Sequence, residues 1–200
     1  MDASGDLGGQ EQESESGLYY INFFAQLRPE TARALMTAMS ECAERNAKEV
    51  HLLITSPGGG VVAGITLHNV LRGMPFKLVT HNMGHVASSG VVVYLAGEER
   101  LTCPHSTFLL HGVTRSVEEG DFEAEWFRES LDDILATEAK TNAILSDRTR
   151  LTQKQLERFR ESEETKDAKA AVKSGIAHRI EDIDIPDDAV VYTVPIPPPV

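Results

Sequence analysis

The feature that most constrains this chain is an alternation of short, β-prone apolar runs with longer segments whose apolar residues recur at helical spacing. Strands and helices that alternate in this way are typical of an α/β fold. The predicted strands are Leu18–Ala25, Val50–Thr55, Phe76–His81 and Ser106–His111. The predicted helices are Pro29–Ala47, Val62–Leu71, Phe122–Asp147, Thr152–Phe159 and Ala168–Ser174.

The segment Val91–Leu95 fits two kinds of structure. Its three consecutive valines are β-branched and favour a strand by propensity. The small residues Ala87-Ser-Ser-Gly90 that precede it would equally suit the tightly packed start of a buried helix. Pattern alone favours the strand, and the helix stays open.

The two ends of the chain differ in composition from its middle. Residues 1–17 carry five acidic residues and no Lys or Arg, and such a segment buries too little apolar surface to offset its ordering entropy. We therefore expect a disordered acidic arm over 1–17 and one domain over 18–182. Residues 183–200 are rich in proline and should form an extended tail with a possible edge strand at Val190–Val194.

Charge excludes several classes of partner. The 31 acidic and 19 basic residues give a formal net charge of −12, so nucleic acid and anionic membrane surfaces would be repelled. No apolar run approaches the roughly 18 residues of a membrane span, and the first residues lack a signal-peptide pattern, so we expect a cytoplasmic protein. Cys42 and Cys103 have no metal-ligand spacing and are expected in the core, and no cofactor motif is present.

Two stretches could carry chemistry. Met83-Gly-His-Val-Ala-Ser-Ser-Gly90 offers two hydroxyls, and a serine becomes a nucleophile only beside a base. Of the seven histidines, His111 ends an apolar strand and precedes a glycine, so a rigid element would hold its imidazole, whereas His85 is expected on a turn. Ser56-Pro-Gly-Gly-Gly60 follows a strand and could turn backbone N–H groups toward an oxyanion, or could serve only as a turn.

Four stretches, in the same order, resemble the proteolytic subunit of the Clp protease family (ClpP) over about residues 18–180. They are Ile54-Thr-Ser-Pro-Gly-Gly-Gly-Val-Val-Ala-Gly64, Met83–Gly90, Cys103-Pro-His-Ser-Thr-Phe-Leu-Leu-His111 and Ala171-Val-Lys-Ser-Gly-Ile176. The resemblance implies a ClpP/crotonase-like fold of repeated ββα units, with the helix over 122–147 projecting as a handle. It also implies a serine endopeptidase that cleaves polypeptides inside a homo-oligomeric chamber without a metal or other cofactor.

The resemblance assigns residues to roles. Ser88 matches the nucleophile and His111 the general base. The backbone N–H groups of Ser89 and Gly59, with Gly58 as a further candidate, match the oxyanion donors. An ungapped match backward from Gly175 places the family's catalytic acid on Glu163, where a glutamate replaces the aspartate.

The acid position has alternatives. Glu161 and Glu164 lie close enough that a shift of one or two residues would move the role to them, and all three could instead form a solvated acidic face. In that last case the site would be a Ser–His dyad or inactive.

The chain departs from the family at two further places. Val113-Thr-Arg-Ser-Val-Glu-Glu-Gly120 replaces the family's glycine-rich peptide groove, so peptide recognition should differ. Residues 1–17 have no counterpart to the segment that engages an AAA+ unfoldase, which argues against that partner. Two alternatives to an active peptidase stay open: a catalytically silent subunit of a mixed complex, and a crotonase-like enzyme acting on acyl-CoA.

The long predicted helix carries an apolar stripe beneath many acidic residues. The stripe consists of Phe127, Leu131, Ile134, Leu135 and Ala139. Trp126 and Phe127, near the start of this helix, are candidates for a subunit interface, with burial in the core as the plainer alternative.

Overall fold

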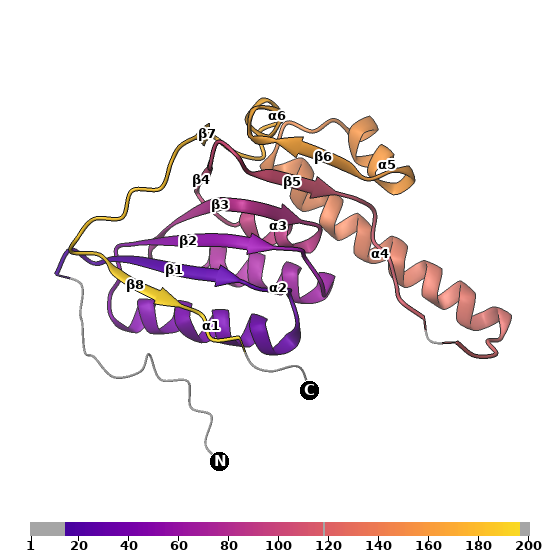
Figure 1. Cartoon of the computed structure of the whole chain (residues 1–200). Helices are drawn as coiled ribbons and strands as arrows, with labels where there is room; N and C mark the ends of the chain where they lie inside the picture. The colour runs from indigo at the N-terminus through magenta and orange to yellow at the C-terminus, as the bar shows by residue number, and fades with distance from the viewer. Residues whose placement is uncertain (1–14, 118, 197–200) are drawn as a thin grey trace, which may run out of the picture.

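A computed structural model describes residues 15–117 and 119–196, which form an α/β fold of one sheet with helices packed against it (Figure 1). The strands are β1 Leu18–Phe24, β2 Glu49–Ser56, β3 Lys77–Ala87, β4 Glu99–Thr102, β5 Thr107–Leu110, β6 Glu164–Asp167, β7 Arg179–Ile180 and β8 Val190–Thr193. The helices are α1 Pro29–Glu44, α2 Val61–Arg72, α3 Ser89–Tyr94, α4 Ala124–Arg148, α5 Gln153–Glu161 and α6 Ala168–Lys173. The predictions for residues 1–14 and 197–200 lie outside the described residues.

One sheet of eight strands has the order β6-β5-β3-β2-β1-β8. β4 also pairs with β3, and β7 pairs with β4. The strands pair in parallel, except that β6 runs antiparallel to β5. Along β1, Tyr19, Ile21 and Phe23 alternate into the hydrophobic core, as one face of a strand should. The predicted edge strand at Val190–Val194 is confirmed as β8, which pairs with β1.

The strand interpretation of Val91–Leu95 is wrong, because this segment forms α3 and the turn that follows it. The edge of β3 that leads into this segment is already paired with β5 through Val86 and Phe108. A strand over the three valines would therefore find no partner there. As a helix, the segment buries Val91, Val92 and Val93 to 3% exposure or less. Tertiary packing thus overrides β propensity.

β3 is longer than predicted and changes partners along its length. It pairs with β4 up to Asn82, and from His85 onward it pairs with β5. His85 therefore lies in the strand and not in a turn, and its Nδ1 is 2.9 Å from Thr107 Oγ1. The exchange brings the end of β5, followed by His111, beside the end of β3, followed by Ser88.

The long helix expected over 122–147 is present as α4, and Figure 1 shows its N-terminal part extending past the sheet. Its C-terminal end is held by the buried guanidinium of Arg100, which donates to the carbonyl oxygens of Arg148 at 2.9 Å and Gly175 at 3.1 Å. Arg148 in turn donates to Leu95 O at 3.1 Å. These bonds place the last turns of α4 against α3. No helix in the described ranges is both long and apolar enough to cross a bilayer.

The two cysteines differ in environment. Cys42 is 1% exposed in the core, as expected, and burial raises the pKa of its thiol to about 12. Cys103 is only half-buried, so the expectation of a core position is wrong for it. Its Sγ lies 3.9 Å from Met83 Sδ, and the two cysteines are not bonded to each other.

Two histidines form a buried pair on the sheet. His51 Nδ1 lies 2.8 Å from His81 Nε2, and His51 Nε2 lies 2.8 Å from Glu49 Oε1. Tyr20 stacks on the His51 ring with a centroid distance of 4.4 Å. In the His51–His81 contact one ring nitrogen must accept, so at least one of the two imidazoles is neutral. Burial, and then the neighbouring His51, lower the pKa of His81 to about 4.

This pair predicts a pH-dependent stability. An unfolded histidine takes up a proton near pH 6.5, whereas folded His81 does so only near pH 4, so the unfolded state binds more protons between these values. Stability should therefore be complete above pH 6.5 and be lost as the pH falls toward 4. We expect urea unfolding to give a free energy of unfolding about 2 kcal/mol lower at pH 5 than at pH 7.5. His81→Gln should flatten this dependence, and an unchanged slope in that variant would contradict the assignment.

Candidate active site

Ser88 stands at the junction of β3 and α3 in a backbone conformation that few residues adopt. Its φ is 53° and its ψ is −129°, which places a non-glycine residue in the left-handed half of the map. Such a conformation costs on the order of 1–3 kcal/mol and persists only where the surroundings hold it. The holding contact is a hydrogen bond from the Ser88 N–H to Leu109 O at 2.9 Å. Backbone strain of this kind is concentrated at functional sites.

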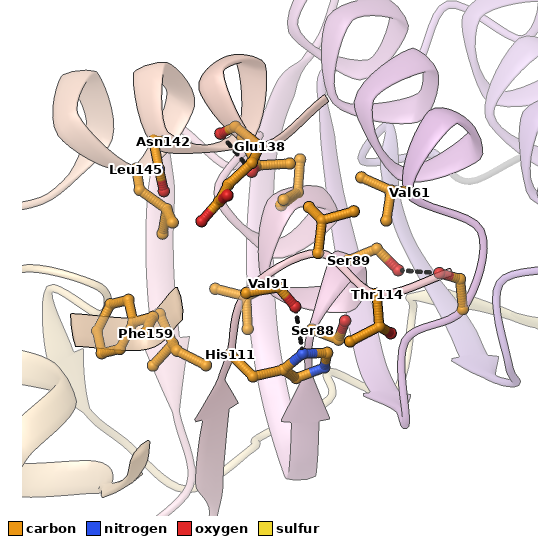
Figure 2. A pocket seen from close by; sticks show the side chains of 16 residues that line it. Val61, Ser88, Ser89, Val91, His111, Thr114, Glu138, Asn142, Leu145 and Phe159 are labelled. Carbon is orange, nitrogen blue, oxygen red and sulfur yellow. Dashed lines mark hydrogen bonds between the residues drawn. The ribbon is translucent and has the colours of Figure 1, made fainter. Parts of the chain in front are cut away.

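His111 follows the last residue of β5 and lines the same pocket as Ser88 (Figure 2). Its Nδ1 lies 2.6 Å from Gly112 O. A carbonyl can only accept, so this bond puts the proton on Nδ1 and leaves the lone pair on Nε2. That is the tautomer a general base needs. In the part of the chain that the structure describes, no hydrogen bond joins His111 to Ser88 Oγ.

Other histidines have structural partners away from this pocket. His68 is 4% exposed on α2 and its Nδ1 donates to Val92 O at 2.8 Å, beneath α3. His178 Nδ1 accepts from the Arg100 N–H at 3.3 Å, and His51 and His81 pair with each other. Among the residues lining the Ser88 pocket, His111 is the one imidazole.

The glycine turn lies directly against the Ser88 segment. Gly59 lines the pocket, and its carbonyl accepts a hydrogen bond from Ser89 Oγ at 3.1 Å. Gly59 pairs with Leu27 in a parallel bridge, in which Leu27 bonds to Gly58 and Gly60 on either side. In this pattern the N–H and carbonyl of Gly59 itself point away from Leu27, which is the side of the pocket. The N–H of Ser89 lies in the first turn of α3, where backbone N–H groups have no acceptor within the helix.

Side chains are excluded from two positions of this turn. Gly59 has a φ of 139°, and an added Cβ would lie 2.3 Å from Leu27 O. Gly58 has a φ of 86°, and its Cβ would lie 2.7 Å from both Ala87 O and Ser88 Cβ. Glycine is therefore needed for the turn to approach Ser88.

Gly58 does not fit the oxyanion role that the sequence allowed it. Its N–H already donates to Ser56 Oγ at 3.1 Å, and its carbonyl accepts from the Leu27 N–H at 2.7 Å. It is also absent from the residues that line the pocket. Gly58 therefore supports the turn, and Gly59 and Ser89 are the two candidate donor residues that line the pocket.

The three candidate acids differ in their position relative to β6. Antiparallel pairing ends at Leu110 and Glu164, so His111 and Glu163 are each the next residue beyond the last observed pair, and one further step of pairing would set them opposite each other. Opposed residues of an antiparallel pair share a face of the sheet. Glu164 is bonded to the buried Lys166 instead, and Glu161 ends α5. His111, Glu161 and Glu163 all line one adjoining pocket, and no hydrogen bond between His111 and either acid is found in the described ranges.

Sequence reasoning missed the wall of the pocket that α4 supplies. Glu138, Thr141, Asn142 and Leu145 recur at helical spacing and line the pocket beside Ser88. The helical spacing of these residues is visible in the sequence. Three of the four are polar, however, so the sequence analysis of this helix considered only its apolar stripe. That stripe is largely exposed in the single chain, with Phe127 at 58%, Leu131 at 54% and Leu135 at 39%.

The described residues offer no cluster of metal-ligating side chains. No group of three or more His, Cys, Asp or Glu side chains there is arranged to hold an ion. The groups that converge on the pocket are instead a hydroxyl, an imidazole and backbone N–H donors. This set is suited to nucleophilic attack on a carbonyl.

Comparisons with known proteins agree with the geometry. The profile of the Clp protease family matches residues 19–184. The ATP-dependent Clp protease proteolytic subunit 3 of Rhizobium meliloti is 29% identical over 146 residues, which cover 69% of this chain and 72% of that protein. The corresponding subunit of Streptococcus mutans is 29% identical over 144 residues, covering 69% and 71%.

A solved structure supports the fold. A mutant of ClpP1 from Listeria monocytogenes superposes with a TM-score of 0.72 and 20% sequence identity, covering 84% of this chain and 93% of that one. The family match extends from β1 to beyond β7 and includes Ser88, His111 and the glycine turn. This chain therefore belongs to the Clp protease family.

Proposed function

We propose that this protein is a serine endopeptidase that cleaves peptides or unfolded polypeptides through an acyl-enzyme. The observation that carries the proposal is the placement of Ser88, in a strained left-handed conformation, on the same pocket as His111. Membership of a protease family supports the reaction class. The strained turn supports Ser88, and not Ser89, as the nucleophile, because the Ser89 hydroxyl is bonded to the glycine turn.

The mechanism follows from the groups on the pocket. Ser88 Oγ attacks the scissile carbonyl while His111 Nε2 takes its proton, and the imidazolium then protonates the leaving amine. The N–H groups of Gly59 and Ser89 stabilise the oxyanion, and donors of this kind contribute about 3 kcal/mol each. Water, activated by His111, then releases the acyl group from Ser88.

Glu163 completes the triad in this proposal. Glu163 would lie opposite His111 if the pairing of β5 and β6 were extended by one step, and this favours it over Glu161 and Glu164. To reach the imidazole, the pairing of β5 and β6 extends by one residue pair and the Nδ1–H moves from Gly112 O to the carboxylate. The carbonyl of Gly112 holds the same tautomer before that exchange.

We also propose that the protein works as a homo-oligomer. The exposed stripe on α4 continues into an aromatic cluster, in which Phe122 and Trp126 have ring centroids 4.2 Å apart and Trp126 and Phe127 5.2 Å apart. Apolar residues this exposed in one chain are typical of an interface. An AAA+ unfoldase and a cytoplasmic location remain predictions of the sequence.

Labelling with a fluorophosphonate, together with light scattering after size-exclusion chromatography, tests both proposals. We expect the probe to label Ser88, identified by peptide mapping, and the chain to elute as an oligomer. Tight binding of an acyl-CoA without labelling would favour the crotonase-like alternative. Absence of both reactions, with recovery of an active sister subunit in a pull-down, would favour the silent subunit.

A further inference from the structure

We propose that Glu138 selects the substrate side chain that enters the pocket beside Ser88, and that this side chain is lysine or arginine. The inference rests on the proposed peptidase function and adds a substrate class to it. In a serine peptidase, the pocket beside the nucleophile receives the side chain of the residue whose carbonyl is attacked. The chemistry of the pocket wall therefore determines which residue precedes the cleaved bond.

The walls of this pocket are apolar on most sides. The apolar residues come from α3, β5, α4 and α5, and all of those named next are 8% exposed or less. They are Val91, Val92, Leu110, Leu145 and Phe159. Such walls can pack the methylene stem of a long side chain.

The side of the pocket formed by α4 is polar. Glu138, Thr141 and Asn142 occupy one face of the helix, and Figure 2 shows Glu138 on α4 across from the segment that carries Ser88 and Val91. Thr141 donates its hydroxyl to the backbone oxygen of Glu138 at 2.9 Å and so does not bind the carboxylate. The carboxylate is therefore the charged group that this wall presents.

Glu138 is a buried carboxylate whose two oxygens share a single donor. The residue is 4% exposed, and both of its oxygens lie 2.9 Å from the same Arg160 Nε. One N–H is thus shared between two oxygens that together offer about four acceptor positions. The Arg160 side chain is itself 53% exposed. A buried charge paired with a half-solvated cation gains from a second donor.

Lysine and arginine fit this pocket better than other residues. Their stems are apolar and their tips are cationic, so one side chain satisfies both the walls and the Glu138 carboxylate. A leucine would cover the carboxylate without supplying a donor, and an acidic residue would be repelled. The formal net charge of −12 also attracts basic peptides.

Arg160 competes with the substrate for Glu138 and provides a second variant with a different expected result. Removing the guanidinium should leave the carboxylate free for a substrate cation. Glu138→Gln removes the charge and keeps the shape, whereas Arg160→Gln keeps the charge and removes its present partner. If the pair were only a structural clasp between α4 and α5, both variants would lose activity on every substrate alike.

The test uses the full-length protein and fluorogenic peptides that differ only in the residue before the cleaved bond, which is lysine, arginine or leucine. We expect the wild type to favour lysine and arginine over leucine in kcat/KM. Glu138→Gln should lower kcat/KM for the basic peptides about 10- to 100-fold and leave the leucine peptide within about threefold. Arg160→Gln should keep or increase the preference for basic peptides.

Labelling of Ser88 in every variant separates the possible failures. A labelled wild type that prefers leucine, or an equal loss on all peptides in Glu138→Gln, would overturn the inference and leave the peptidase function standing. A wild type that neither labels nor cleaves any peptide would overturn the proposed function and this inference with it.

Discussion

Replacing Ser88 by alanine is expected to reduce kcat for peptide hydrolysis about a millionfold, close to the rate without a nucleophile. The reason is that the hydroxyl forms the acyl-enzyme, and the oxyanion donors cannot replace it. Alanine is smaller than serine and, like serine, carries no charge, so binding of the peptide should persist. The measurement is the single-turnover rate on a fluorogenic peptide, together with loss of fluorophosphonate labelling.

Ser89→Ala is the matched control for this prediction. It removes the hydroxyl that donates to Gly59 O at 3.1 Å, but it leaves the backbone N–H of residue 89 in place. Loss of one such hydrogen bond costs about 1 kcal/mol, so the rate should fall about tenfold at most. If instead Ser89→Ala abolished activity and Ser88→Ala retained it, the nucleophile would be Ser89.

The strained backbone adds a second readout. Ser88 has a φ of 53°, which alanine tolerates no better than serine, so the substitution should leave the free energy of unfolding nearly unchanged. Ser88→Gly should raise stability by about 1 kcal/mol, because glycine adopts this conformation without strain. Loss of activity together with a gain of stability is the signature of strain held for function.

Replacing Glu163 by glutamine is expected to lower kcat about ten-thousandfold, the second-largest effect that we predict. The carboxylate would stabilise the imidazolium that forms on His111 during attack, and a neutral amide cannot. Binding of substrate does not involve this group, so KM should change little.

Glu161→Gln and Glu164→Gln are the controls, since both remove one negative charge from the same short stretch. The register of β5 and β6 sets neither residue opposite His111, and Glu164 is bonded to Lys166. Each should retain activity within about tenfold of the wild type. A large loss in one of them, with Glu163→Gln active, would move the role. Full activity in all three would indicate a Ser–His dyad oriented by the Gly112 carbonyl.

Much of the fold was predictable because hydrophobic periodicity is a local property. The long segments with strong periodicity, such as α1 at Pro29–Glu44 and α4 at Ala124–Arg148, are found within a few residues of their predicted bounds. Short strands were missed. β6, Glu164–Asp167, has the sequence ETKD, which carries no apolar pattern, and it forms because β5 offers it an edge.

The candidate site was likewise predictable only in part. The resemblance to the Clp protease family named Ser88, His111 and the glycine turn as candidates, because short motifs in a fixed order can be recognised without knowledge of packing. The N–H of Gly58 could not be excluded as an oxyanion donor, since its hydrogen bond to Ser56 Oγ exists only in the folded turn. Glu138 was missed because its place on the pocket wall depends on how α4 packs beside α3.

The sequence by itself therefore determined the α/β class, the long helix and the residue types that could attack a carbonyl, since these follow from local pattern and order. Only the tertiary structure decided that Val91–Val93 form a helix, that Glu163 is the acid next beyond the last pair of β5 and β6, and which carboxylate lines the pocket beside Ser88. The physical reason is that these outcomes depend on which strand edges and helix faces meet, and contacts between distant segments leave no periodic trace in the chain.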